Sequence, residues 1–304
     1  MTRVATAVVA YRWGQPAQNH LIRQVWRPWV IARRAEGLVD AALFDRFDTR
    51  GPHVTLFVEW AGAAAERDAV RTEWVEHLCA ELRQGIESRP DPSLLSADEL
   101  AAHHAGCRGK SQCSIDRRSG FGEKDSIHAV AHPADGYPFG LTRDLPTADT
   151  VWDAVSDLAL WAADQLPDER DGVAALAALG TVIAFDREMG ARGDAEPFWQ
   201  FYAGTLRLDL AERQQAGEAL DSLRADLPDL IGAANQRRLA ALWASADRLP
   251  RPPALGRLLD ALGPHLRMSR ECCHLVLKQL GWPVPHHVPA VLYAWWRAAT
   301  KAEP

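Results

Sequence analysis

The hydrophobic pattern of this 304-residue chain changes once, and the two patterns demand different secondary structure. Residues 1–90 contain short alternating, β-rich runs separated by amphipathic stretches, whereas residues 147–304 show helical spacing throughout. Alternation places every second side chain on one face of a strand, and a period of about 3.6 makes one face of a helix apolar. The sequence therefore predicts an α+β fold, in which an N-terminal mixed or antiparallel sheet packs on a largely α-helical C-terminal half.

The first 90 residues are predicted to run strand, helix, strand, strand, helix, with strands at 4–13, 39–47 and 53–60 and helices at 19–34 and 63–86. Pro28 lies inside the first helical run and should kink or divide it, because proline lacks an N–H and clashes with the preceding turn. Residues 91–146 are rich in proline and glycine and contain one predicted strand, at 126–131. Long irregular segments are often functional, so active-site loops are expected there.

The remaining chain predicts helices at 147–166, 170–189, 195–224, 228–247, 253–263, 268–280 and 286–300. Thr147 and Ser269 are residue types that cap helix N-termini. We treat residues 1–304 as a single fold with three subregions, which are 1–90, 91–146 and 147–304.

Composition excludes several classes of protein. No stretch approaches the roughly 20 apolar residues that a membrane-spanning helix needs, and the N-terminal run is interpreted as a strand rather than a signal peptide. We therefore expect a cytoplasmic protein that does not bind membranes. The net charge of −6 argues against nucleic-acid binding, and the arginines between Arg23 and Arg34 are interpreted as solvated surface.

Five cysteines are expected to be reduced thiols, because an odd number in a chain of this length does not suggest a disulfide framework. Four of the possible metal ligands fall close together, at His103, His104, Cys107 and Cys113. Their spacing fits no usual structural zinc site, and no second C-x-x-C follows. We therefore expect no metal.

The segment from Tyr11 to Trp60 resembles the thiopeptide-type bacteriocin biosynthesis domain, which serves as the glutamate-elimination module of lantibiotic dehydratases. The matching positions, in order, are Tyr11, Pro28, Gly37, Phe44, Asp48, Pro52 and His53. A weaker match lies at His265–Arg270 (HLRMSR), which resembles the family motif H-M-H-x-N-R. Residues 90–250 match only in general helical character.

Departures from that family pattern point to a different reaction. Thr55 and Phe57 stand where the family has arginines that would hold a glutamyl carboxylate or stabilise an enolate. Arg267 and Ser269 replace a histidine and an asparagine. A stand-alone relative without the elimination residues resembles the pyridine synthases of thiopeptide biosynthesis.

That resemblance implies an enzyme that joins two dehydroalanines of one precursor peptide by a formal aza-[4+2] cycloaddition. Loss of water and of the leader peptide would then give a pyridine core. The implied partner is a modified precursor peptide, with a leader and a dehydrated, azole-bearing core, and other biosynthetic enzymes are further candidate partners. No metal or redox cofactor is required.

Such a reaction needs positioning of the peptide together with a proton donor and acceptor. Tyr202 lies in the aromatic segment PFWQFYAGTLR and could protonate a carbonyl, and Trp199 beside it could contact the peptide. The alternative is a core tyrosine whose hydroxyl is satisfied. Ser126 and His128 lie two apart on a predicted strand and so face the same side, as a proton-handling pair or as an ordinary polar edge.

The other candidates, apart from Tyr137, follow from the resemblance. His53 sits on the strand that forms the family's active face, as a catalytic group or as inherited architecture. Ser269 and Arg270 are candidate catalytic groups, and His265 is a candidate substrate-binding residue; Ser269 could instead cap its helix. Tyr137 in GYPFG is a candidate substrate-binding residue or a turn residue.

Two other functions remain open. The chain could be a split dehydratase subunit that eliminates glutamate, although the missing strand arginines speak against it. It could also be a non-catalytic partner that binds a leader peptide. Twelve tryptophans and an available sheet edge would suit peptide capture by strand addition or in a helix groove.

Overall fold

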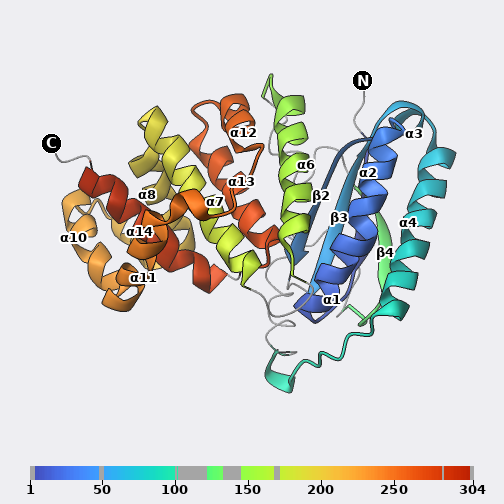
Figure 1. The fold of residues 1–304 in the computed structure, drawn as a ribbon, viewed down its shortest axis with the longest axis horizontal. Coiled ribbons are helices and arrows are strands. Elements are labelled where there is room, and N and C mark those ends of the chain that lie inside the picture. The colour runs from blue at the N-terminus through green and yellow to red at the C-terminus, as the bar shows by residue number, and fades with distance from the viewer. Residues whose placement is uncertain are drawn as a thin grey trace. The chain divides into compact units, whose positions relative to one another are not determined.

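The computed structural model describes residues 4–47, 51–99, 101, 122–132, 145–167, 172–282 and 284–301. The chain divides into two compact units, Met1–Asp171 and Gly172–Pro304 (Figure 1). The first unit contains a four-stranded sheet with helices, and the described part of the second unit is helical. The predicted α+β class is therefore confirmed.

The sheet of the first unit is antiparallel throughout and has the strand order β2-β3-β1-β4. Its strands are β1 (Ala5–Ala10), β2 (Val39–Phe47), β3 (His53–Trp60) and β4 (Ile127–His132). A helical run joins β1 to β2, and α3 (Gly62–Glu66) and α4 (Asp68–Ser88) follow β3. This order of elements and strands is the split β-α-β arrangement of ferredoxin-like folds.

Helices pack against one face of this sheet. The Trp26 ring meets Phe44 of β2 edge-on, with centroids 5.1 Å apart, and α4 lies against the same helical run, where Gly85 approaches Val25 and Leu21. Because side chains alternate along a strand, the neighbours of Phe44 point to the opposite face. We call this opposite face the distal face. Its strand positions include Val9, Asp45, His53, Thr55, Phe57 and His128.

Pro28 divides the first helical run, as predicted, through a change of hydrogen bonding. The run consists of α1 (Gln15–His20), a π-helix (Leu21–Trp26) and α2 (Arg27–Ala35). Proline cannot donate to the carbonyl four residues earlier, and a π-helical turn shifts the pairing to five residues. The Pro28 ring is thus accommodated at the start of α2.

Helix α6 (Ala148–Gln165) covers the outer edge of β2 and pairs with the arginines of α2. The Ser156 hydroxyl accepts the Ala42 backbone N–H at 3.0 Å, so an edge amide of the sheet is satisfied. Arg27 lies 2.6 Å from Asp164, and Arg34 lies 3.4 Å from Asp157. Two arginines of this basic segment, Arg27 and Arg34, are therefore engaged by acidic side chains of α6.

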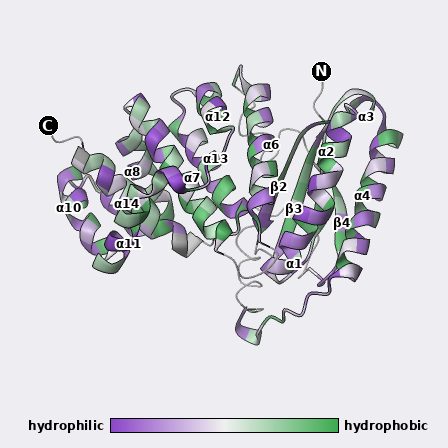
Figure 2. Cartoon of the chain, viewed as in Figure 1, coloured by the Kyte–Doolittle hydropathy of each residue, from purple (hydrophilic) through white to green (hydrophobic). Residues whose placement is uncertain are grey.

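The second unit contains α7 (Val173–Arg192), α8 (Ala195–Leu206), α9 (Leu208–Gln215), α10 (Leu220–Ile231), α11 (Ala233–Ala244), α12 (Leu255–Leu262), α13 (Leu266–Gln279) and α14 (Val284–Lys301). Figure 2 shows that apolar and polar residues alternate around these helices, as expected where each helix has one buried side. No helix in the described ranges combines the length and apolarity required to cross a membrane.

The prediction of one helix over 195–224 was wrong, because three helices occupy that range. Arg207 has an extended backbone, with φ −124° and ψ 100°, and separates α8 from α9. Gly217 has a φ of +76°, which ends the next helix. The predicted helix at 228–247 begins only at Ala233, because Gly232, with φ +79°, separates it from α10.

Two glycines of α7 provide a matched test of helix packing. A Cβ atom at Gly180 would lie 2.1 Å from the carbonyl oxygen of Pro250, whereas a Cβ at Gly190 would meet nothing within 4 Å. Gly180→Ala is expected to lower the free energy of unfolding by about 1–3 kcal/mol through overpacking. Gly190→Ala is expected to raise it by about 0.5–1 kcal/mol through lower backbone entropy of the unfolded chain. Denaturant titration measures both, and a Gly180→Ala variant as stable as wild type would contradict the close packing.

Candidate functional site

An aromatic cluster occupies one end of the distal face. The Tyr11 ring lies between His53, with centroids 4.9 Å apart, and His128, with centroids 6.2 Å apart. Phe47 stacks on His53 at 5.4 Å. The carbonyl oxygen of Gly51 lies 2.8 Å from His53 Nδ1, and because a carbonyl only accepts, Nδ1 carries a proton. His53 is buried, and these contacts fix its ring.

Ser126 and His128 lie on the same side of the chain and form a hydrogen bond of 2.9 Å between Oγ and Nε2. The Ser126 hydroxyl donates its own proton to the Glu123 carbonyl at 2.5 Å. It therefore accepts from His128 Nε2–H. Since the hydroxyl proton is not directed at the imidazole, this geometry does not activate Ser126 as a nucleophile.

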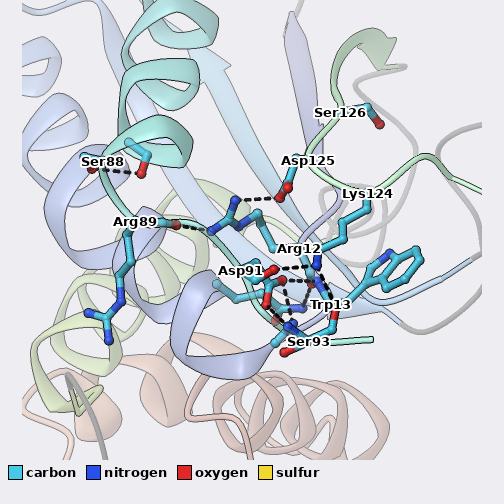
Figure 3. Close-up of polar contacts among 12 residues, drawn as sticks. Arg12, Trp13, Ser88, Arg89, Asp91, Ser93, Lys124, Asp125 and Ser126 are labelled. Atoms are coloured by element: carbon cyan, nitrogen blue, oxygen red, sulfur yellow. Dashed lines mark hydrogen bonds and ion pairs between the residues drawn. The ribbon is translucent and has the colours of Figure 1, made fainter. Parts of the chain in front are cut away.

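Asp91 is the centre of a group of hydrogen bonds, here called the polar node, that holds the backbone at Trp13, Gly14 and Ser93 (Figure 3). The Asp91 carboxylate accepts the backbone N–H groups of Trp13 at 2.8 Å, Gly14 at 2.9 Å and Ser93 at 3.0 Å. Burial alone would raise the pKa of Asp91, but its hydrogen bonds to Gly14 and Ser93 and the nearby Arg12 outweigh burial and hold this pKa below its ordinary value.

Two cations complete this node and connect it to β4 (Figure 3). The fully buried Arg12 lies 2.5 Å from the Asp125 carboxylate and also donates to the Arg89 carbonyl. Lys124 donates to the backbone carbonyls of Asp91 and Ser93. Asp125 has a left-handed φ of +65°, and its N–H donates to the Tyr11 carbonyl. The node thus fixes the turn immediately before Ser126.

A second cluster lies within the helical unit and joins three helices. The Tyr202 hydroxyl of α8 is 3.1 Å from Nδ1 of His274 on α13. The His274 ring meets that of His287, on α14, edge-on at 5.6 Å, and His287 Nε2 donates to the Trp282 carbonyl at 2.6 Å. Tyr202 and His287 are fully buried, whereas His274 is partly exposed.

Burial keeps the ionisable members of this second cluster neutral. Burial, with Lys278, His287 and Arg270 nearby, lowers the pKa of His274 to about 3. Burial also raises the pKa of Tyr202 well above its ordinary value. Burial raises the pKa of Cys272 to about 12 and raises that of Cys273 well above its ordinary value, so both thiols stay protonated. The cluster therefore offers neutral proton donors and acceptors.

The remaining predicted residues of this unit lie on α8 and α13. Trp199 stacks on Tyr202 with centroids 6.2 Å apart, and Arg270 pairs with Glu271. The interpretation of Ser269 as a helix cap was wrong. The N-cap position of α13 is the exposed His265, whose carbonyl accepts the Ser269 N–H at 3.0 Å, and the Ser269 hydroxyl is buried without a partner in the described structure.

The structure thus divides the predicted residues between two units. Ser126, His128 and His53 belong to the first unit, and the second unit contains Tyr202, Trp199, His265, Ser269 and Arg270. Tyr137 and the His103–Cys113 motif lie outside the described residues. Within the described ranges, no three His, Cys, Asp or Glu side chains are grouped as metal ligands would be. His274 was missed by the sequence analysis, although it follows the predicted Arg270 by one helical turn.

The lowered pKa of His274 makes a prediction about stability at acidic pH. Because the folded-state pKa of about 3 lies below the ordinary value of 6.5, neutral His274 favours the folded state above pH 6.5. This contribution is lost as the pH falls from 6.5 towards 3. Between about pH 6 and about pH 4, His274→Gln should reduce the pH dependence of the free energy of unfolding by up to roughly one proton. An unchanged slope would contradict the neutral state.

Comparison with solved structures places this fold beside a pyridine synthase, TbtD, from thiomuracin biosynthesis. The match has a TM-score of 0.58 and 20% identity, and it covers 99% of both chains. TsrL matches with a TM-score of 0.48 and 14% identity, over 99% of this chain and 95% of TsrL. The tRNA-dependent lantibiotic dehydratase MibB from Microbispora sp. 107891 matches with a TM-score of 0.43 and 14% identity, over 97% of this chain and 28% of MibB.

No protein-family model matches the chain, and no curated protein matches it by sequence. The similarity found is therefore one of fold. The resemblance seen at Tyr11–Trp60 and His265–Arg270 is confirmed at the level of fold: over 99% of its length, this chain shares the fold of the pyridine synthase TbtD.

Proposed function

We propose that this chain cyclises a dehydrated precursor peptide in thiopeptide-type biosynthesis by a formal aza-[4+2] cycloaddition of two dehydroalanines. Loss of water and of the leader peptide would then give the pyridine. The fold shared with a pyridine synthase over 99% of both chains supports this proposal. The partner would be a peptide with a leader and a modified core.

The composition of the distal face is the observation that favours cyclisation over glutamate elimination. Thr55, where the resemblance leads us to expect arginine, is buried opposite Asp45 in the register of β2 and β3. Phe57 occupies the second such position, and Glu59 follows on the same face. None of the described strand positions on this face is a lysine or arginine. The carboxylates on this face, those of Asp45 and Glu59, would repel a glutamyl group rather than hold it.

The proposed cyclisation needs neutral proton donors and acceptors rather than arginine or lysine side chains. One dehydroalanine amide must become an iminol, which moves a proton from nitrogen to oxygen without a net change in charge. A neutral imidazole that is held by a neutral phenol is matched to such a transfer. Positioning of the two alkenes would supply the larger part of the acceleration, since effective molarity is worth about 7–11 kcal/mol.

The remaining candidates keep supporting roles in this proposal. Ser126 and His128 form a proton-handling pair beside His53, while Ser269 and Arg270 handle or polarise polar groups of the core peptide. His265 and Tyr137 contact the peptide, whereas the fully buried Trp199 acts through its stacking on Tyr202. Each assignment is testable by single substitution once turnover has been measured.

Mass spectrometry of a synthetic precursor distinguishes the candidate functions. The substrate carries the leader, azoles and two dehydroalanines, and its matched control replaces one dehydroalanine with alanine. Cyclisation predicts a core lighter by one water, with the leader released as a separate species, and no change in the control. Loss of glutamate from a glutamylated precursor would instead indicate an elimination subunit. Unchanged mass with retained binding would indicate a leader-binding partner.

A further inference from the structure

Tyr202 is held too deeply to reach a peptide directly. Its side chain is fully buried between aromatic rings, with Phe198 at 6.3 Å and Trp199 at 6.2 Å between centroids. Its hydroxyl proton needs an acceptor in this apolar environment, and His274 Nδ1, at 3.1 Å, provides one. The Tyr202 hydroxyl therefore donates its proton in a hydrogen bond to His274 Nδ1.

His274 is the member of the cluster that combines a fixed ring with access from outside. Because Tyr202 donates to Nδ1, the ring proton of neutral His274 resides on Nε2. The edge-on contact with His287 at 5.6 Å restricts rotation of the ring. His274 is only partly buried, so Nε2 is the nitrogen left for a substrate.

The positive charges near His274 would stabilise a substrate carbonyl oxygen that becomes more negative during the reaction. Arg270 and Lys278 lie four residues before and after it on α13, and residues at this spacing share one helix face. Glu271 pairs with Arg270, His287 approaches from α14, and Tyr202 approaches from α8. Two cations thus flank a neutral N–H donor.

We infer that His274 is a catalytic residue whose Nε2 exchanges protons with the reacting dehydroalanine amide, and that Tyr202 is a positioning residue that fixes the His274 tautomer. This inference rests on the proposed cyclisation. A neutral imidazole that polarises a carbonyl oxygen is a known catalytic device. It requires that the ring remain unprotonated, and burial together with the nearby Lys278 and Arg270 favours this by lowering the His274 pKa.

The transfer balances as a tautomerisation. Nε2 gives its proton to the carbonyl oxygen, and the π pair of the C=O bond forms the new O–H bond. The amide nitrogen gives its proton to the vacated Nε2, and the N–H pair becomes the C=N bond. One proton has moved from nitrogen to oxygen, and His274 is neutral before and after the step.

Kinetics of the intact protein with the bis-dehydroalanine substrate test the assignment. His274→Ala is expected to lower kcat by about 100-fold or more, with the affinity for a fluorescent leader peptide unchanged. His274→Gln should also lose activity, because a carboxamide can donate a hydrogen bond but is a much weaker base than an imidazole. Tyr202→Phe should lower kcat about tenfold. His77→Ala, which removes an exposed histidine of α4, is the control and should keep wild-type activity.

Nitrogen-15 NMR of labelled histidines supplies a readout that does not depend on activity. The wild-type ring should be neutral with its proton on Nε2 at about pH 6, and Tyr202→Phe should shift the population towards the Nδ1–H form. A protonated His274 or a wild-type Nδ1–H tautomer would overturn the inference. If both His274 variants kept the wild-type kcat, the catalytic role of His274 would be refuted, whereas the proposed cyclisation would not be. A wild-type protein that fails to cyclise the substrate would refute the proposed function itself.

Discussion

Replacing Asp186 with alanine is expected to lower the free energy of unfolding of the helical unit by about 3–5 kcal/mol, because two buried indoles lose one shared acceptor. Asp186 Oδ1 accepts Trp199 Nε1–H at 3.0 Å, and Oδ2 accepts Trp243 Nε1–H at 3.2 Å. Asp186 is 6% exposed. It joins α7 to α8 and α11, so its removal leaves two donors buried without a partner. Urea titration measures the change.

An exposed aspartate in the same unit provides the control. Asp247 is 85% exposed and pairs with Arg187 and Arg251. Its replacement by alanine should cost less than about 1 kcal/mol, since exposed ion pairs contribute little. Asp186→Asn keeps one acceptor oxygen but places an amide donor against an indole donor, so an intermediate loss is expected. If Asp186→Ala and Asp247→Ala cost the same, Asp186 does not hold the three helices together.

The Asp186 link also connects stability to the proposed catalytic cluster. Trp199 stacks on Tyr202, whose hydroxyl holds His274. Loosening the Trp199 indole therefore removes a restraint on the phenol before the unit unfolds. Asp186→Asn should accordingly lower turnover under conditions where the protein remains folded.

Patterns that are local in the sequence were predicted well. The strands at 39–47 and 53–60 were predicted with the bounds that β2 and β3 have, because alternation and the turn signal between them act over a few residues. Ser126 and His128 were expected on one side of a strand, and their 2.9 Å hydrogen bond agrees. The division of the helical run near Pro28 was also predicted from a local signal, which is the proline itself.

Contacts between distant residues could not be predicted. Tyr202 and His274 are 72 residues apart, and Asp91 lies 78 residues from Trp13. Helical spacing predicts which face is buried but not which neighbour lies against it, so His274 looked like any polar residue of α13. The break at Arg207 was missed because the apolar period continues across it, while the backbone becomes extended.

Asp91→Ala is expected to destabilise the first unit by about 3 kcal/mol or more, because charged hydrogen bonds to buried amides are lost. The carboxylate accepts the N–H groups of Trp13 and Gly14 just ahead of α1, where helix N-termini leave amides unsatisfied. Asp91 is 7% exposed, so water replaces it poorly. Thermal and urea unfolding measure the loss.

The lowered pKa of Asp91 gives this prediction a pH dependence of known sign. Because the folded-state pKa lies below the ordinary 3.8, the ionised carboxylate stabilises the fold above pH 3.8, and this contribution is lost as the pH falls through the folded value. The gap in stability between wild type and Asp91→Ala should therefore narrow in acid. Asp68→Ala, at a 91% exposed position of α4, should cost less than about 1 kcal/mol at any pH. A gap that persists below the folded pKa would mean that Asp91 acts through packing rather than through its charge, and the turn before Ser126 would then not depend on an ionised carboxylate.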